Sequence, residues 1–285
     1  MNNYKKFTKH LKTNNLFYAI WRGIKYFIFV IKWKGKYFES LSENMIVKGN
    51  IKMYCSNGGI NIFWKDKKIT SDPGLNVAVN TLGLWTDSSK AEWQILKRDD
   101  DFLNVKIVFK ELPMEQIWFL KINSDNEIDW RVQANVEEWT HIDEFRVLTM
   151  VNSYYKIWLS DYDYADFPRL DDYWYDIYLN NKPVSLVGVR FSKGDNFLPP
   201  LVIGSQEENL LPLIQNPPLI NNAHIVGVRI NKLNDTNNFE PGNYEVFSGK
   251  IVLFEEESQL DKKIENIRQG YLKTVTSKSK LGEVS

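Results

Sequence analysis

The stretch QIWFLKINSDNEIDWRVQANV, residues 116–136, predicts a β-hairpin. After the turn Asn123-Ser124-Asp125-Asn126, apolar and polar side chains alternate with a period of two, which is typical of a strand with one buried face. Before the turn, Trp118, Leu120 and Ile122 share the face opposite the one that carries Lys121. The positions predicted to be buried are Trp118, Leu120, Ile122, Ile128, Trp130, Val132 and Ala134. The hairpin therefore has one face for a core and one for solvent.

Short runs of this kind recur from Met45 to Phe254 and are separated by turn residues such as Ser56-Asn57-Gly58-Gly59, Asp72-Pro73-Gly74 and Asn180-Asn181. The predicted strands are 46–54, 59–64, 75–79, 91–97, 102–109, 116–122, 127–136, 145–150, 154–159, 173–178, 184–191, 201–203, 223–230 and 244–254. No amphipathic helices lie between them, so the fold class is all-β, a large antiparallel β-sandwich. Parallel α/β folds are excluded.

Three parts are expected along the chain: an N-terminal basic amphipathic helical segment (1–44), a β-sandwich domain (45–256), and a short C-terminal helix with a disordered tail (257–285). The charged segment 255–272 has apolar residues at helical spacing, namely Leu260, Ile264, Ile267 and Tyr271. One large domain is preferred over two for the body.

All charge in residues 1–38 is positive: nine Lys or Arg precede the first acid, Glu39. The whole chain has 36 basic and 36 acidic residues, so 27 basic and 36 acidic residues remain after residue 38, a −9 body behind a +9 leader. The run 16–33 is apolar but interrupted by Arg22, Lys25 and Lys32, which share one side of a helix. A full membrane crossing and a cleaved signal peptide are therefore both disfavoured.

Such a helix is expected to lie in the headgroup plane of an anionic cytoplasmic membrane face, with residues 1–38 as the contacting segment. The residues expected to bind the membrane are Trp21, Arg22, Lys25, Lys32 and Trp33. The alternative is a helix whose apolar face packs on the body or on a partner protein. The expected location is cytoplasmic, peripheral on the inner face of the cell membrane.

Several functional classes are excluded. Cys55 is the only cysteine and there are three histidines, so no metal site and no cofactor are expected. The chain has no GxxxxGK[ST], GxGxxG, HExxH or GxSxG motif, which leaves nucleotide hydrolysis, dinucleotide redox chemistry and zinc proteolysis without support. The acidic body argues against nucleic acid as a partner.

The order of aromatic residues carries a family resemblance. A turn at Gly74 is followed by 84–88 (LWTDS), 91–93 (AEW), a long hairpin with Trp118 and Trp130, and the aromatic strand 154–158 (YYKIW). This order resembles the galactose-mutarotase-like β-supersandwich superfamily over about residues 49–254. The resemblance implies a supersandwich fold and contact with sugars. Mutarotases use a His/Glu acid–base pair, and since neither His141 nor His224 aligns with it, their activity does not carry over.

The segment 160–178, SDYDYADFPRLDDYWYDIY, interleaves six Asp with aromatic rings. Rings stack on sugar faces while carboxylates and Arg bind hydroxyl groups, so this segment is a candidate glycan contact. The candidate ligand-binding residues are Asp161, Asp163, Tyr164, Asp166, Arg169, Trp174 and Arg190. A structured surface loop with Asp-capped turns is the alternative, and calcium held by Asp161, Asp163 and Asp166 is a third, less supported by the spacing.

Titratable residues also gather around His141, and the candidate catalytic residues are His141, Asp143 and Glu144. Carboxylates close enough to repel would supply a general acid and a general base. On a strand His141 and Asp143 share a face, whereas Glu144 points the other way. A solvated turn is the preferred interpretation. Arg190 and Arg229, each in a Val-Gly-Val-Arg pattern, are expected to have acidic partners.

The favoured function is a carbohydrate-binding β-sandwich protein, peripherally membrane-associated and acting with cell-surface polysaccharide biosynthesis or modification, with a glycan or sugar as ligand. A non-catalytic role is favoured over an enzymatic one. One alternative is an epimerase, lyase or hydrolase on the same scaffold. The other is a structural or assembly subunit that docks on a protein partner through its N-terminal helix.

Overall fold

The computed structural model describes residues 44–56, 58–192, 197–205, 210–230, 237–267 and 269. The chain divides into two compact units, 1–45 and 46–285; the description below concerns the second. The predicted leader helix, with Trp21, Arg22, Lys25, Lys32 and Trp33, lies outside the described residues, as does the predicted tail.

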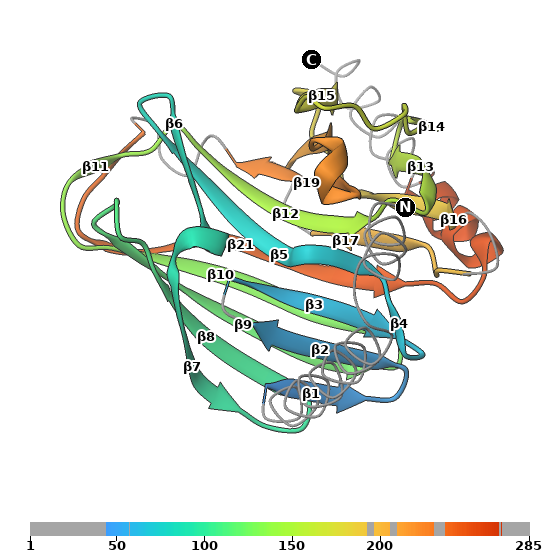
Figure 1. Ribbon diagram of the computed structural model, residues 1–285, viewed down its shortest axis with the longest axis horizontal. Coiled ribbons are helices and arrows are strands. Elements are labelled where there is room, and N and C mark those ends of the chain that lie inside the picture. Colours follow the sequence, from blue (N-terminus) through green and yellow to red (C-terminus); the bar gives the residue numbers. More distant parts are fainter. Residues whose placement is uncertain are drawn as a thin grey trace, which may run out of the picture. The chain divides into compact units, whose positions relative to one another are not determined.

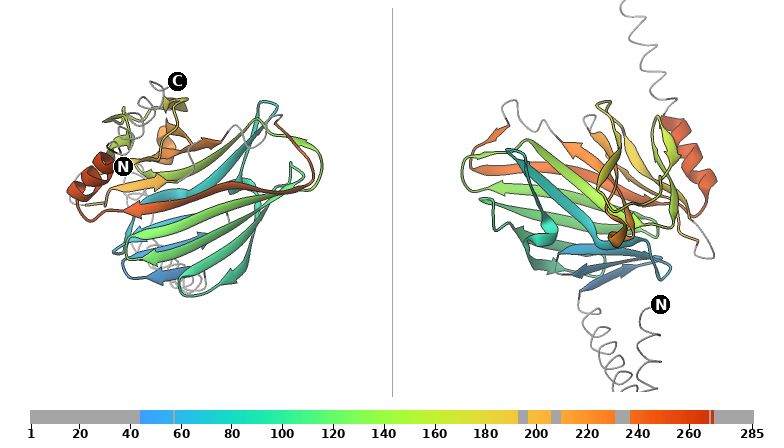
Figure 2. Two further views of the ribbon diagram at one scale, coloured as in Figure 1. Left: turned by 180° about the vertical axis from the view of Figure 1, so that it is seen from behind. Right: turned by 45° about the horizontal axis from the view of Figure 1, so that its top comes forward.

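The body is a sandwich of two large sheets (Figures 1 and 2), and the strand pairs from β2 to β21 are antiparallel. The ten-stranded sheet has the order β1-β2-β3-β5-β12-β19-β18-β15, with β4 beside β3 and β6 beside β5. The nine-stranded sheet has the order β14-β13-β16-β17-β21-β10-β9-β8-β7, and β11 pairs with β20. The predicted all-β antiparallel sandwich is confirmed.

The strands of the ten-stranded sheet are β1 (Met45–Lys48), β2 (Ile51–Ser56), β3 (Gly59–Trp64), β4 (Lys67–Lys68), β5 (Thr70–Thr81), β6 (Leu84–Asp87), β12 (Glu144–Asn152), β15 (Tyr175–Leu179), β18 (Leu211–Asn216) and β19 (Ala223–Ile230). Those of the nine-stranded sheet are β7 (Glu92–Arg98), β8 (Phe102–Val108), β9 (Met114–Ser124), β10 (Glu127–Val136), β13 (Tyr155–Ser160), β14 (Tyr164–Asp166), β16 (Leu186–Ser192), β17 (Leu201–Gly204) and β21 (Gly242–Leu253). The small pair is β11 (Thr140–His141) and β20 (Asn238–Phe239), and η1 (Ser88–Lys90) and η2 (Leu219–Asn221) are short 3-10 turns.

The core lies between the two large sheets, where their inward side chains meet. All seven positions predicted to be buried in β9 and β10 are fully buried, so the predicted alternation is confirmed. Trp118 is the centre of an aromatic row: its ring lies 5.1 Å from Trp93 and 5.4 Å from Trp130, and Trp130 lies 5.5 Å from Phe247. These large rings, together with aliphatic residues of the ten-stranded sheet, close the sandwich.

Two predicted features of the β1–β5 region are wrong. The predicted strand 46–54 is broken at Gly49, which has φ +56° and separates β1 from β2. Asp72-Pro73-Gly74, predicted as a separating turn, lies inside β5. The physical reason is that the Asp72 side chain is bound within its own sheet instead of capping a turn.

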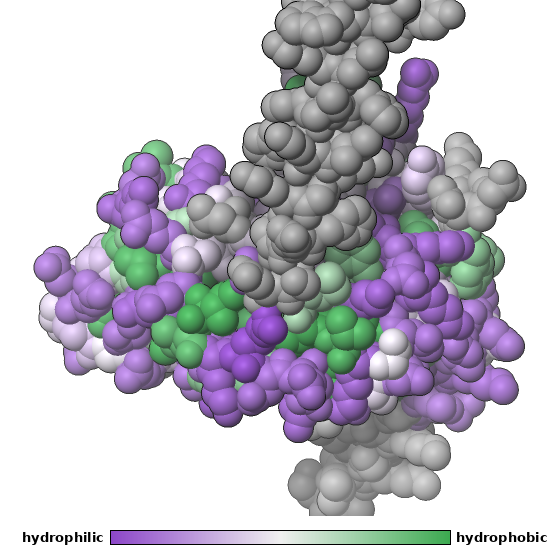
Figure 3. Space-filling model, turned by 60° about the horizontal axis from the view of Figure 1, so that its bottom comes forward, coloured by the Kyte–Doolittle hydropathy of each residue, from purple (hydrophilic) through white to green (hydrophobic). Residues whose placement is uncertain are grey.

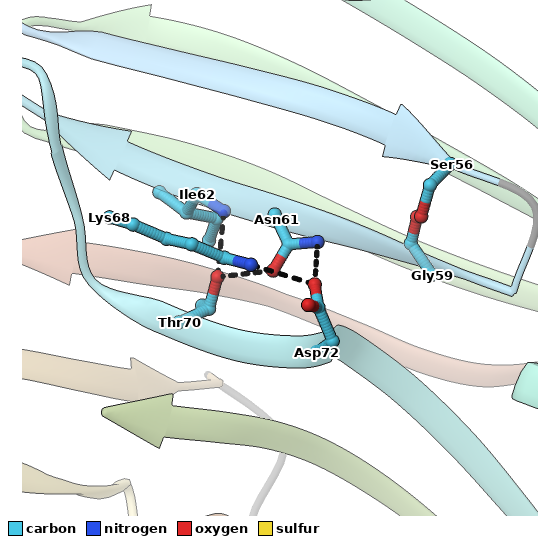
Figure 4. A network of polar contacts seen from close by, with 7 residues as sticks. All are labelled: Ser56, Gly59, Asn61, Ile62, Lys68, Thr70 and Asp72. Atoms are coloured by element: carbon cyan, nitrogen blue, oxygen red, sulfur yellow. Dashed lines mark hydrogen bonds and ion pairs between the residues drawn. The ribbon is translucent and has the colours of Figure 1, made fainter. Parts of the chain in front are cut away.

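Figure 4 shows how Asp72 is held. Nδ2 of Asn61 and Nζ of Lys68 donate to its carboxylate at 2.8 and 2.7 Å. Thr70 donates its hydroxyl to Oδ1 of Asn61 at 3.1 Å and accepts the backbone N–H of Ile62 at 3.0 Å. Burial raises the pKa of Asp72, but the hydrogen bonds and positive charge from Lys68 and the hydrogen bond from Asn61 outweigh it and lower the pKa. The network joins β3 to the beginning of β5.

A helical segment, residues 257–267, follows β21 and packs on the outer face of the nine-stranded sheet. Leu260 and Ile264 are buried against Leu159, Leu186 and Val202. The predicted C-terminal helix is therefore confirmed over these residues, while Tyr271 lies outside the described part.

Figure 3 brings forward the side of the molecule that is at the bottom of Figure 1, where β1 and β7 lie, and shows patches of hydrophobic residues among hydrophilic ones. Partly exposed apolar side chains on these strands include Val47, Ile95 and Leu96. Within the described residues, no helix has the length and apolar character needed to cross a membrane.

Gly74 and Gly83 give a matched test of how closely β3 and β5 approach. Both have left-handed backbones, with φ +84° and +83°. A Cβ on Gly74 would lie 2.0 Å from the carbonyl oxygen of Ile60, whereas one on Gly83 would meet nothing within 4 Å. We expect Gly74→Ala to lower the free energy of unfolding by about 3 kcal/mol or more, and Gly83→Ala by about 1 kcal/mol, measured by urea denaturation. Equal losses would contradict the close approach.

Candidate functional site: a groove on the ten-stranded sheet

Strand β12 supplies side chains to two different environments because its residues alternate. Phe145, Val147 and Val151 point into the core between the sheets. Leu148 and Met150 belong to a separate apolar cluster, with Ala78 of β5 and Ile225 of β19. This second cluster lies on the outer face of the ten-stranded sheet and forms an apolar floor there.

Above this floor lies a groove with a volume of about 600 Å³. It crosses the sheet from β6 and η1 on one side to β15 and β18 on the other. Its polar and aromatic lining consists of Asn76, Trp85, Asp87, Ser89, Arg146, Trp174, Tyr175, Asp176, Gln215 and Asn221. An apolar floor with convergent polar groups is the usual composition of a small-molecule site.

Two tryptophans stand on opposite sides of the groove. Trp85 comes from β6 and is 42% exposed, and Trp174 precedes β15 and is 52% exposed. The guanidinium of Arg146 lies 4.0 Å from the ring centre of Trp85, a cation–π contact that fixes this ring. Both rings therefore present part of their surface to solvent at the groove.

A carboxylate on each wall is held by a neighbouring amide. Asn76 Nδ2 donates to Oδ1 of Asp87 at 3.3 Å, and Gln215 Nε2 donates to Oδ1 of Asp176. Asp87 also accepts the backbone N–H of Ser89 at 2.9 Å. Asn76 and Gln215 are 6% and 2% exposed, and the carbonyl oxygen of each has no hydrogen-bond partner among the described residues.

Glu144 lies beside the Trp85 end of the groove and is held between two arginines. Arg146 Nε donates to its Oε1 at 2.6 Å, and Arg229 Nη1 lies 3.6 Å from its Oε2. Arg229 Nη2 also donates to the backbone carbonyl of Asn180 at 2.9 Å. The acidic partner expected for Arg229 is therefore Glu144, and this carboxylate orients Arg146 against Trp85.

Of the predicted ligand-binding residues, only Trp174 lines this groove. Asp161 is fully buried, and its two carboxylate oxygens accept the backbone N–H groups of Ser185 and Leu186. This carboxylate fixes the chain and is not available to a ligand or to calcium. Asp163 accepts the hydroxyl of Tyr178.

Two further candidates, Tyr164 and Arg190, lie on the nine-stranded sheet. The Arg190 guanidinium is 5.3 Å from the Tyr164 ring and forms an ion pair with Asp261 of the helical segment at 2.7 Å. The acidic partner expected for Arg190 is thus Asp261. These contacts are between protein groups and leave neither residue in the groove.

Asp166 and Arg169 line a second hollow of about 620 Å³. His224 lies in its wall, stacked on Phe167 at 3.8 Å between ring centres, with Nδ1 2.6 Å from Oδ1 of Asn216. Burial lowers the pKa of His224 to about 4, opposed by a hydrogen bond to the backbone of Ser153. His224 is therefore neutral at physiological pH.

His141 and Asp143, predicted as catalytic with Glu144, share a face as expected. His141 Nε2 lies 2.9 Å from Oδ1 of Asp143, and its Nδ1 lies 2.9 Å from Oδ1 of Asn238. The hydrogen bonds to Asn238 and then Asp143 raise the pKa of His141, and the bond with His141 lowers that of Asp143. This pair sits on the β11–β20 turn region and does not line the groove.

Three of the groove residues that the sequence analysis missed lie on strands that were not predicted, whereas Asn76, Arg146 and Asp176 lie on predicted strands and were not identified as site residues. Gln215 lies on β18 and Trp85 with Asp87 on β6, and neither segment was assigned as a strand. The sequence feature that could have indicated the site is LWTDS at 84–88. It contributed to the family resemblance, but its residues were not proposed as binding residues.

Among the described residues, no group of three or more His, Cys, Asp or Glu is placed to hold a metal ion. The groove offers carboxylate, amide and guanidinium groups on an apolar floor, which suits binding of a polar, ring-containing molecule.

No family model matches the chain, and no curated protein matches its sequence. Among solved structures, the chain is similar to a proposed aldose 1-epimerase of Escherichia coli K12 (TM-score 0.48, 9% identity, 74% of this chain and 97% of that one). It is also similar to a GH36 alpha-galactosidase of Geobacillus stearothermophilus (TM-score 0.42, 8% identity), covering 74% of this chain and 40% of that one. Both TM-scores are below 0.5, so no property of either protein is carried over to this chain.

His224 gives a test of the buried wall of the second hollow. Its folded pKa of about 4 is below the unfolded value of about 6.5, so the unfolded state binds an extra proton between these values and stability falls as pH is lowered from 7 to 4. We expect this histidine to account for about 3 kcal/mol of that fall, measured by urea denaturation at each pH. His224→Asn should lose this part of the pH dependence and His141→Asn should keep it; identical curves for all three proteins would contradict a buried, neutral His224.

Proposed function

We propose that the groove on the ten-stranded sheet binds a glycan and that the protein acts by holding it. The observation that carries this proposal is the pair of exposed tryptophans, Trp85 and Trp174, on opposite sides of one groove with an apolar floor. Sugar rings have apolar faces that stack on indoles and hydroxyl groups at their edges. Asp87 and Asp176 are placed on the walls to accept such hydroxyl groups, and Arg146 to donate to them.

The second part of the proposal concerns where the protein is located in the cell and which process it serves. The nine cations of residues 1–38, interleaved with large apolar residues, support attachment to an anionic membrane surface at the cytoplasmic face. A glycan-binding body held there would serve the biosynthesis or modification of a cell-surface polysaccharide. The competing possibility is a leader that docks on a protein partner.

An enzymatic role on the same scaffold has one observation in its favour. Asp87 and Asp176 stand on opposite walls of the groove, and each uses its Oδ1 to accept an amide hydrogen. Two carboxylates flanking a bound sugar are the arrangement that glycoside hydrolysis requires. His141 and Asp143 are outside the groove, so this role would rest on the two aspartates.

Trp174→Ala tests the site. We expect about tenfold weaker binding of the glycan that a glycan array selects, because a stacked indole contributes about 1–2 kcal/mol. The affinity is measured by isothermal titration calorimetry. Stability should hardly change, since the ring is half exposed.

Trp139→Ala is the matched control, because Trp139 is 67% exposed and does not line the groove. It should bind as the native protein does. If Trp174→Ala retains full affinity, or both variants lose it equally, the glycan does not occupy this groove.

The membrane proposal is tested by pelleting with liposomes that contain anionic or only zwitterionic lipids. We expect the full chain to pellet with anionic vesicles and a chain lacking residues 1–38 to stay in the supernatant, because each basic residue adds about 1 kcal/mol of attraction. Added salt should weaken the pelleting of the full chain. Equal pelleting of the two proteins would rule out the leader as the anchor.

A further inference from the structure

The Asp176–Gln215 pair on one wall of the groove includes two hydrogen-bond acceptors, Oδ2 of Asp176 and Oε1 of Gln215. One N–H of Gln215 Nε2 donates to Oδ1 of Asp176, and the amide also carries a second N–H and a carbonyl oxygen. Gln215 is 2% exposed and lines the groove, and its Oε1 has no partner among the described residues. A buried acceptor left without a donor is destabilising, so its position at a groove points to a ligand that supplies the donor.

The orientation of the Gln215 amide follows from chemistry. If its nitrogen and oxygen were exchanged, the carbonyl oxygen would face the Asp176 carboxylate, and two acceptors would oppose each other. The amide nitrogen therefore faces Asp176 and the oxygen faces away. Asn76 and Asp87 repeat this arrangement on the opposite wall, again with the amide oxygen unpaired.

The two walls differ in charge. On the Trp85 side, Arg146 and Arg229 form ion pairs with Glu144, and Lys90 lies 4.0 Å from Asp87. The carboxylates on this side therefore have positively charged neighbours. On the Trp174 side, Asp176 forms no ion pair with any described residue. The Trp174 end of the groove thus combines a carboxylate without a cation, a buried amide oxygen and an exposed indole.

We propose that this end is a subsite for a protonated amino group, so that the ligand is a glycan that carries an amino sugar. This inference rests on the proposed function and adds the substrate class. An ammonium group has three donors and one positive charge, which match Oδ2 of Asp176, Oε1 of Gln215 and the indole face of Trp174. A neutral sugar supplies donors without the charge, and a uronic acid brings a second carboxylate, which Asp176 repels.

The test follows the indole N–H resonance of Trp174 by NMR while methyl glycosides of glucosamine, glucose and glucuronic acid are titrated separately into the full chain. We expect glucosamine to bind at least about fivefold tighter than glucose, since hydrogen bonds to charged groups exceed neutral ones by about 1 kcal/mol. No shift is expected with glucuronic acid. Equal affinity for glucosamine and glucose, or binding of glucuronic acid, would overturn the inference and leave glycan binding intact.

Asp176→Asn tests the role of the negative charge, because the side-chain amide oxygen can still accept the Gln215 hydrogen while the charge is lost. It should remove the preference for glucosamine and retain binding of glucose. Asp172→Asn is the control, since Asp172 is exposed in the same segment, does not line the groove, and should keep the preference. An unchanged preference in Asp176→Asn contradicts the assignment.

Methylammonium and acetate, titrated alone, separate the two proposals. If methylammonium shifts the Trp174 resonance, acetate does not, and no sugar binds, the cation subsite stands while the glycan function fails. If neither methylammonium nor any glycoside shifts it, both proposals fail.

Discussion

The groove depends on the two-residue period of strand β12, which commits neighbouring side chains to opposite faces of the ten-stranded sheet. Phe145 and Val147 hold this strand against the core, so the positions between and beyond them must face outward. Glu144, Arg146 and Leu148 take those outward positions, and each has a defined partner there. A register slip of one residue would place Glu144 and Arg146 in the core. Burial of Phe145 and Val147 therefore determines which side chains of β12 face the groove.

The second constraint is how far the strands that carry the groove lie from one another in sequence. Asp87 and Asp176 are brought to the same groove only because β5, β12, β19 and β18 are paired between β6 and β15. The apolar cluster under the groove has members on all four of these central strands and is separate from the main core. Sheet formation thus builds the floor and the walls of the groove together.

The fold was predictable because burial acts on each strand locally. The alternation in β9 and β10 indicated the buried face residue by residue, and Trp118 and Trp130 are buried as the pattern requires. The site was less predictable, because it depends on pairings between distant strands. β18 reads LPLIQN, in which all six positions are buried, so no alternation reveals the outward Gln215. Asp161 shows the same dependence on distant segments, because backbone N–H groups 24 and 25 residues away bind its carboxylate.

The unpaired amide oxygens of Asn76 and Gln215 link stability to binding. Each buried acceptor without a donor costs about 1–3 kcal/mol, a large fraction of the free energy that holds a domain together. Replacing either amide with an apolar residue would remove that cost but would also release the adjacent aspartate, whose position the amide fixes. The groove is thus held in an ordered arrangement that carries the cost of two buried amide oxygens without a hydrogen-bond donor among the described residues. Each amide thus has one end fixed on an aspartate and the other buried in the wall of the groove.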